Sequence, residues 1–157
     1  MIIDPSDACP VGFNPLALPG DPTLIADAVL AVFQEIFSEN WGIRSQDVLS
    51  AALLTLMHTK GASLLWLPAL LTNESFRHRI TDKLQDEVVL KPFWKSYDAM
   101  RDTERKQEIA PVLNKMRQFL YRPGLRSVLG QSEPRFHLTD LFYHRRVVLV
   151  PLNKGSI

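Results

Sequence analysis

The sequence predicts a mainly α protein: a compact domain of about five to seven helices, with short strand segments at the N- and C-terminal ends. Three observations favour this fold class. Between about residues 22 and 130, apolar residues recur every three or four positions, as on one face of a helix. Helix-capping residues, prolines and glycines separate these runs. Short apolar, β-branched runs occur only near the two ends.

Length and composition fit one globular domain. The chain has 157 residues, of which 46% are hydrophobic and 22% are charged, which is enough to bury a core. Its longest apolar runs, such as 64–71, are too short to cross a bilayer. The start, Met1 to Pro5, does not resemble a signal peptide, and the single Cys9 excludes an intrachain disulfide and fits a reducing compartment. We therefore expect a cytoplasmic protein.

The composition divides the chain into three parts. Residues 1–21 are a strand-like start, near Met1–Asp4, and a Pro-rich connection. Residues 22–130 form the helical domain, and 131–157 are a return connection that ends in a terminal strand over about 146–152. The prolines that exclude regular structure from the first part are Pro5, Pro10, Pro15, Pro19 and Pro22.

The first two helices are predicted over about 22–39 and 45–58. Asp21 is an N-cap and Pro22 follows at the first helical position, a preferred site for proline. The first helix carries one apolar stripe, made of Ile25, Val29, Val32, Phe33, Ile36 and Phe37. Ser45 is the predicted cap of the second helix, which is apolar nearly all round and is therefore predicted to be central.

The next helices are shorter. Ser63 is expected to cap a helix over 64–71 that is shaped by Pro68. Thr72 or Asn73 caps a further helix that carries Phe76, Ile80 and Leu84 at steps of four. Asp86 is expected to open another, and Pro92 to kink or divide it.

The last long helix is predicted from Thr103 to about Leu120, with a bend at Pro111. Its apolar stripe is Ile109, Val112, Leu113, Met116, Phe119 and Leu120. The sequence Arg122-Pro123-Gly124 then turns into a short helix that Gly130 ends.

The sequence carries no recognisable catalytic, cofactor or metal motif. It contains neither GxGxxG nor GxxxxGK[ST], and its four histidines have no metal-ligand spacing. Cys9 has no nearby histidine to activate it. We therefore expect a chain that is not itself an enzyme and that uses no cofactor and no metal.

Charge is distributed unevenly. Residues 111–157 hold eight Lys and Arg against two Asp and Glu, whereas the whole chain is close to neutral at +1. A basic segment next to aromatic side chains can bind a single nucleic acid strand. The predicted contact residues are Arg77, Arg79, Lys115, Arg117, Tyr121, Arg122 and Arg126. Phe76 and Phe119 fall on core stripes and are expected to pack. A solvated helical face with buried ion pairs remains the alternative interpretation of the basic residues.

Several segments in order resemble one protein family. They are "IIDPSD", "GFNPL", "NWGIRSQDVLSAALLTL", "LPALLTNESFRHRI", "PVLNKMRQFL" and "VVLVPLNKGSI". Together they resemble the helical insertion of the conjugative DNA-transfer ATPases, the coupling proteins of type IV secretion in the HerA–FtsK group of P-loop motors. In that family a strand ends in an Asp-Pro pair, which Asp4-Pro5 matches. The chain then passes an Asn-Pro-Leu, here Asn14-Pro15-Leu16, and returns on an apolar strand, here ending at Leu152-Asn153-Lys154-Gly155.

The resemblance implies a bacterial substrate-recognition domain carried by a larger motor. The parent would be a hexameric ATPase that uses ATP and Mg²⁺ at the inner face of the cell membrane, next to a secretion channel. The domain would contact DNA, the relaxosome or secreted proteins. Walker A and Walker B lie outside these 157 residues, so hydrolysis would belong to the motor domain. A stand-alone helical protein-interaction module is the alternative, but it does not explain an apolar strand at each end.

Overall fold

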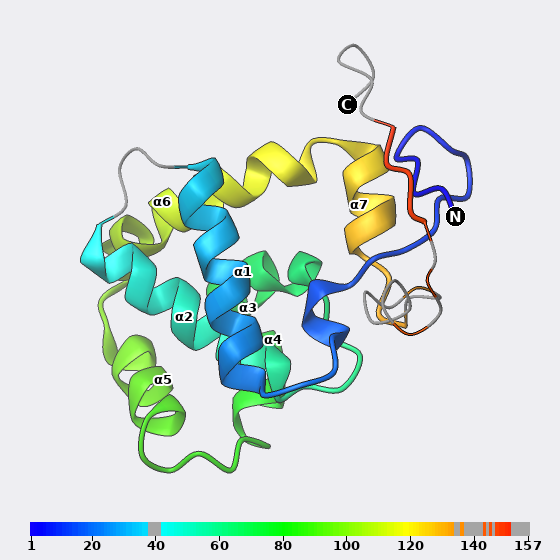
Figure 1. Cartoon of the computed structure of the whole chain (residues 1–157). Helices are drawn as coiled ribbons and strands as arrows, with labels where there is room; N and C mark the ends of the chain where they lie inside the picture. Colours follow the sequence, from blue (N-terminus) through cyan, green and yellow to red (C-terminus); the bar gives the residue numbers. More distant parts are fainter. Residues whose placement is uncertain (38–41, 134–135, 137–142, 144, 146, 152–157) are drawn as a thin grey trace.

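The structure, a computed structural model, describes residues 1–37, 42–133, 136, 143, 145 and 147–151. These residues form helices packed in layers, joined by short loops (Figure 1). The prediction of a mainly α fold is confirmed. Over the described ranges the helices are η1 (Pro15–Ala17), α1 (Pro22–Ile36), α2 (Ile43–Met57), η2 (Leu64–Trp66), α3 (Leu67–Thr72), α4 (Glu74–Thr81), α5 (Leu90–Ala99), α6 (Asp102–Leu120) and α7 (Pro123–Leu129), where η denotes a 3-10 helix.

Helix α2 lies at the centre of the core, as predicted. It contacts α1, α3, α5 and α6, and its residues Ala52 and Leu53 are fully buried. A helix that is apolar on nearly every side is stable only when other elements cover all of those sides. The core therefore forms around α2. In the part of the chain that the structure describes, no helix is long and apolar enough to span a bilayer.

Local capping explains where two of the helices begin. The Asp21 side chain accepts a hydrogen bond from the Thr23 backbone N–H at 2.8 Å, and Pro22 starts α1. The Asn73 side chain accepts from the Phe76 N–H at 2.9 Å and starts α4. Each cap satisfies one of the backbone donors that a helix leaves free at its first turn. Both predicted caps are confirmed.

Two sequence predictions about helix boundaries are wrong. α2 begins at Ile43, after Gly42, so Ser45 is a buried residue of its first turn and not its cap. α5 begins only at Leu90, so Pro92 lies in its first turn, where a missing N–H breaks no helical bond. Pro92 therefore neither kinks nor divides a helix. The predicted end of the first helix, at about residue 39, lies outside the described residues.

The segment before α5 is held by Asp86 rather than by a helix. Its side chain accepts from the Val88 and Val89 N–H groups at 2.9 and 2.8 Å, and its carbonyl accepts from the Lys91 N–H at 3.1 Å. The Val89 hydrogen bond, above all, holds the pKa of the Asp86 carboxyl below its usual value. By contrast, α6 runs through Pro111 as one helix.

In the part of the chain that the structure describes, the first residues and the segment around Leu149 are joined by one parallel β-bridge, between Ile2 and Leu149. The Ile3 N–H donates to the Leu149 carbonyl and the Leu149 N–H donates to the Met1 carbonyl, each at 2.9 Å. Figure 1 shows the first residues and residues 147–151 side by side at one end of the molecule. The predicted strand segments at the two ends are not observed: over the described residues, an isolated bridge is found in their place. Residues 146 and 152, the predicted limits of the terminal strand, lie outside the described part, as do Asn153 to Gly155.

These end segments are attached to the body through α7. Ile3, Val128 and Phe136 form a small buried cluster, separate from the main core, against which Val148 and Leu129 pack. Alternate side chains of an extended segment point to opposite faces. Ile3 and Val148 therefore face α7, whereas Ile2 and Leu149 are exposed on the other face.

The Pro-rich connection is ordered by one buried amide. The Asn14 side-chain N–H donates to the Ala62 carbonyl at 2.8 Å, and its oxygen accepts from the Leu16 N–H at 3.0 Å. Because both ends of the amide are satisfied, its burial carries little penalty. Asn14 thus joins residues 13–16 to the loop that follows α2.

Candidate binding surfaces

Arg77, one of the predicted nucleic-acid contacts, lies inside the fold and is only 1% exposed. Its Nε donates to the Asp98 carboxylate at 2.8 Å, and its Nη2 donates to the same oxygen. Its Nη1 donates to the Leu70 carbonyl at 3.2 Å, and the guanidinium lies 5.0 Å from the centre of the Tyr97 ring. All three nitrogens are therefore occupied within the fold. The prediction that Arg77 contacts nucleic acid is corrected: this side chain is structural.

The neighbours of Arg77 form one polar cluster between α4 and α5. His78 Nε2 lies 3.1 Å from the second oxygen of Asp98, and the Tyr97 hydroxyl donates to the Leu71 carbonyl at 2.7 Å. Burial raises the pKa of Tyr97 to about 12, although the positive charge of nearby Arg77 acts to lower it. The phenol is therefore neutral at ordinary pH and serves as a hydrogen-bond donor.

Lys115, another predicted contact, is also buried. It is 9% exposed, and it lies on the same helix as the buried side chains of Val112 and Met116. The sequence placed it opposite the apolar stripe, but a long side chain can lay its methylene stem along apolar neighbours. Lys115 is therefore not counted among the candidate contacts.

Four of the predicted residues lie near one another in the sequence, at the end of α6 and in α7. These residues, called here the α6–α7 surface, are Arg117, Tyr121, Arg122 and Arg126. Each is exposed, Tyr121 at 76%. Arg117 donates to the Asn114 side chain at 3.0 Å. Within the described ranges, none of the three arginines has a carboxylate within 4 Å. Their charges are available to an outside anion.

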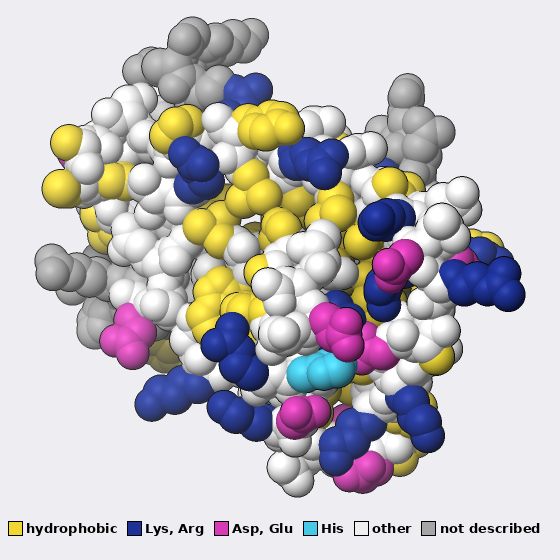
Figure 2. Space-filling model, turned by 180° about the vertical axis from the view of Figure 1, so that it is seen from behind, with side chains coloured by type: hydrophobic (Ala, Val, Ile, Leu, Met, Phe, Trp, Pro, Cys, Tyr) yellow, Lys and Arg dark blue, Asp and Glu magenta, His cyan; other side chains and the backbone are white. Residues whose placement is uncertain are grey.

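Figure 2, seen from behind Figure 1, shows how side chains are distributed on one face of the molecule. Hydrophobic side chains gather in its centre and upper part, and Lys and Arg side chains lie around them. Most of the visible Asp and Glu side chains lie lower on this face, away from that patch. Basic and apolar side chains are thus neighbours on this face, and such a surface can bind a polyanion or a protein partner.

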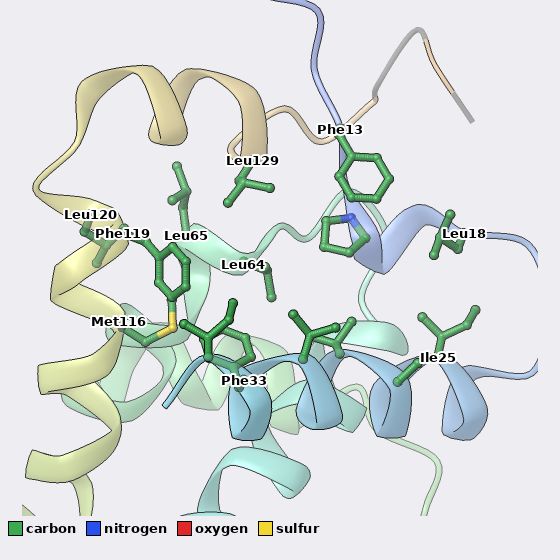
Figure 3. A pocket seen from close by; sticks show the side chains of 15 residues that line it. Phe13, Leu18, Ile25, Phe33, Leu64, Leu65, Met116, Phe119, Leu120 and Leu129 are labelled. Carbon is green, nitrogen blue, oxygen red and sulfur yellow. The ribbon is translucent and has the colours of Figure 1, made fainter. Parts of the chain in front are cut away.

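A second feature is an apolar groove of about 340 Å³ between α1, α6, α7 and the two 3-10 helices (Figure 3). The side chains in Figure 3 converge on it from all of these elements. The groove is lined by Phe13, Pro15, Leu18, Ile25, Ala28, Val29, Val32, Phe33, Ile36, Leu64, Leu65, Met116, Phe119, Leu120 and Leu129.

The groove exists because the apolar stripe of α1 is only partly covered. Phe33 is buried and packs edge-on against Phe119, with ring centres 5.6 Å apart. Val32 and Ile36, on the same stripe, remain 57% and 55% exposed. The sequence predicted the stripe but not this exposure. Phe119 is a packing residue, as expected.

A third feature, called here the basic–aromatic pocket, has a volume of about 410 Å³ and lies beside α4 and η2. Arg79, a predicted contact, is exposed at its wall, whereas His58, Lys60 and Lys83 were not predicted as contacts. Phe76 and Arg79 are three positions apart on α4, so their common face could have been recognised in the sequence, whereas Lys83 lies in the turn that follows the helix. The contributions of η2 and of the loop after α2 depend on tertiary structure.

Among the described residues, no three His, Cys, Asp or Glu side chains are grouped as metal ligands would be. Comparison with known protein families, with curated proteins and with solved structures finds no match to this chain. The surfaces described above and the arrangement of the two ends are therefore the features of this chain that bear on its function.

Proposed function

We propose that this helical body is the substrate-recognition domain of a conjugative DNA-translocating ATPase, inserted between two neighbouring parallel strands of the motor. The observation that carries the proposal is the parallel bridge between Ile2 and Leu149. The sequence resemblance to the type IV secretion coupling proteins supplies the kind of motor. ATP, Mg²⁺, the hexamer and the secretion channel would all belong to the parent protein.

Parallel pairing favours an insertion for a geometric reason. Two parallel neighbours in a sheet must be joined by a long crossover, which is usually helical. Here the whole helical body forms that connection. Moreover, the two segments carry apolar side chains on both faces: Ile3 and Val148 toward α7, and Ile2 and Leu149 on the exposed face. Strands with two apolar faces are typical of parallel sheets that are covered on both sides.

Within this proposal, the α6–α7 surface is the DNA contact. It combines three exposed arginines with an exposed tyrosine, Tyr121. Arginines neutralise phosphates and release counterions, and an exposed aromatic ring can stack on an unpaired base.

The test is single-stranded DNA binding by this chain as a function of salt, measured by fluorescence anisotropy. We expect affinity to fall steeply with salt. Replacing Arg117, Arg122 and Arg126 together with alanine should weaken binding at low salt and reduce the slope of log K against log [salt] by about 2. These side chains are exposed, so the fold should be retained, which circular dichroism would verify.

A matched control removes three exposed cations that lie elsewhere, on α5 and around the start of α6: Lys95, Arg101 and Lys106. If both triple variants lose the same amount of affinity, binding is a general charge effect and the α6–α7 surface is not the DNA contact. If the first triple variant binds as well as the unmodified chain, the assignment is wrong.

The alternative, a helical protein-interaction module, is favoured by a different observation, the apolar groove beside α1. A protein substrate or other protein partner would cover Val32 and Ile36, which are half exposed. DNA binding would then be weak and insensitive to salt, and this outcome would favour the interaction module.

A further inference from the structure

The basic–aromatic pocket is formed by three separate parts of the chain. His58, Thr59 and Lys60 come from the loop after α2, and Trp66 comes from η2. The remaining lining residues belong to α4 and the turn that follows it: Phe76, Arg79, Ile80, Lys83 and Leu84. Its volume of about 410 Å³ lies in the range of roughly 300–1,000 Å³ that small-molecule sites occupy.

Two aromatic rings form one wall of the pocket. Trp66 and Phe76 pack edge to face, with ring centres 5.5 Å apart and planes at 75°. Both are half-buried, so each ring is anchored in the fold and also contributes to the pocket wall. Ile80 and Leu84, which also line the pocket, are buried in the main core and attach this segment to it. A planar group entering the pocket would meet rings whose positions are already fixed.

Three cations converge on the same pocket. The Arg79 guanidinium lies 5.6 Å from the centre of the Phe76 ring, which positions it by a cation–π contact. Lys60 and Lys83 are exposed at the rim. In the described part of the chain, none of these three has a carboxylate within 4 Å. By contrast, Arg44, Arg77, Lys91 and Arg105 each pair with a carboxylate.

Among the described residues that line the pocket, none has an acidic side chain. Asp86 is the nearby carboxylate that must be considered, because its charge interacts with His58. That interaction concerns one edge of the pocket, and among the described residues Lys60, Arg79 and Lys83 still have no carboxylate partner. The pocket therefore presents net positive charge beside an aromatic wall.

From this juxtaposition we propose that the basic–aromatic pocket binds a nucleotide unit, with the base against Trp66 and the phosphate among Lys60, Arg79 and Lys83. A nucleotide is an aromatic ring joined to an anion over a short distance, and the pocket offers the matching groups on neighbouring residues. Stacking on an aromatic side chain and charge-assisted hydrogen bonds to phosphate are the interactions that hold such ligands. The unit could be a free nucleotide or one residue of a single strand.

This inference adds a second contact to the proposed DNA-binding function, and it does not depend on the α6–α7 surface. The test is titration of the chain with AMP, with adenosine and with inorganic phosphate, followed by calorimetry and by tryptophan fluorescence. We expect AMP to bind more tightly than either fragment and to quench fluorescence. Replacing Lys60 and Lys83 with alanine, which leaves the apolar core untouched, should weaken AMP binding about tenfold or more.

Two further variants make the result specific. Trp66→Phe retains an aromatic ring and should abolish most of the fluorescence change, which separates Trp66 from the other tryptophans. The Arg117, Arg122 and Arg126 triple variant should bind AMP normally even if it no longer binds DNA. The source of the nucleotide unit is tested by displacing bound AMP with a short oligonucleotide. Tighter binding of the oligonucleotide than of AMP would identify a single strand as the source, and equal affinity per nucleotide would identify a free nucleotide.

The proposal is overturned if phosphate alone binds as tightly as AMP, since the base then contributes nothing. It is also overturned if Lys60→Ala with Lys83→Ala leaves AMP affinity unchanged, or if AMP produces no heat and no quenching. None of these outcomes bears on the proposed DNA contact at α6 and α7, because the salt dependence of DNA binding tests that contact separately.

Discussion

The Arg77 guanidinium is enclosed by the Asp98 carboxylate, the Leu70 carbonyl and the ring of Tyr97. Its charge is removed from water, and the lost hydration is offset by hydrogen bonds from every nitrogen of the fork. Asp98 keeps partial contact with solvent, at 26% of its side chain. Removal of the arginine would therefore leave an anion that water can partly rehydrate.

Arg77→Ala should destabilise the fold by about 3 kcal/mol, at the lower end of the cost of breaking a buried ion pair, because Asp98 can regain water. Arg77→Lys should recover only part of this, since a lysine cannot reproduce the planar fork. Urea unfolding measures both. The matched control is Arg79→Ala, two positions away and exposed, which should change stability by less than about 0.5 kcal/mol. Equal effects of the two alanine variants on unfolding would contradict the structural role of Arg77.

The contrast between these two arginines explains what the sequence could not predict at this scale. Arg77, His78 and Arg79 are consecutive, and a helix turns about 100° from one residue to the next. One therefore points into the fold, one lies at its edge and one reaches solvent. The basic triplet identified a helical segment rich in positive charge. Which member is buried depends on where α5 places Asp98 and Tyr97.

At the scale of the elements, the docking of the N-terminal segment on α7 depends on a close backbone approach at Gly124. A Cβ atom there would lie 2.1 Å from the Pro5 carbonyl oxygen and 2.9 Å from its carbonyl carbon. Both are backbone atoms, so the clash cannot be relieved by rotating a side chain. The sequence predicted a Pro-Gly turn at this position but could not predict which segment approaches it.

Gly124→Ala should destabilise the protein by about 1–2 kcal/mol, because the free energy lost to the steric clash exceeds the free energy gained from the higher helix propensity of alanine. The effect should be local to the ends. Hydrogen exchange should accelerate at the amides of Ile3 and Leu149, which form the bridge, before it does in α2. As a control, Gly42→Ala places its new methyl 3.9 Å from the nearest atom, Ser45 Oγ, and should leave exchange at the ends unchanged. Unaltered exchange at Ile3 in Gly124→Ala would contradict the close contact.

Helix identity was predictable because its signals are local. Asp21, Asn73 and Gly130 act on residues within one turn of themselves, and each limits a helix as expected. The errors occurred where a signal had two local interpretations: Ser45 as a cap or a first-turn residue, and Pro92 as a kink or a first-turn residue. The apolar groove could not be predicted, because it depends on how far α7 and η2 stand from the stripe of α1.

At the scale of the whole molecule, the first residues of the chain lie next to the segment that follows the helices, residues 147–151. Ile2 and Leu149 are directly opposite in a parallel bridge, with both side chains exposed on the same face. Neighbouring strands lie about 4.8 Å apart, within the roughly 4.4–6.8 Å between Cα atoms that a disulfide spans. The proposed insertion into a parallel sheet requires this proximity to persist in solution.

A variant with Ile2→Cys and Leu149→Cys, in a Cys9→Ser background, should therefore oxidise readily to the intramolecular disulfide. Closing so long a loop restricts the unfolded chain, so the oxidised form should be more stable than the reduced form by up to about 4–5 kcal/mol. The checks are thiol titration, electrophoretic mobility without reductant, and thermal unfolding with and without reductant. The matched control, Val88→Cys with Leu149→Cys, pairs the C-terminal segment with an exposed residue before α5 and should not close. If Ile2→Cys with Leu149→Cys oxidises only between molecules, the two ends do not lie side by side, and the geometric support for an insertion is lost.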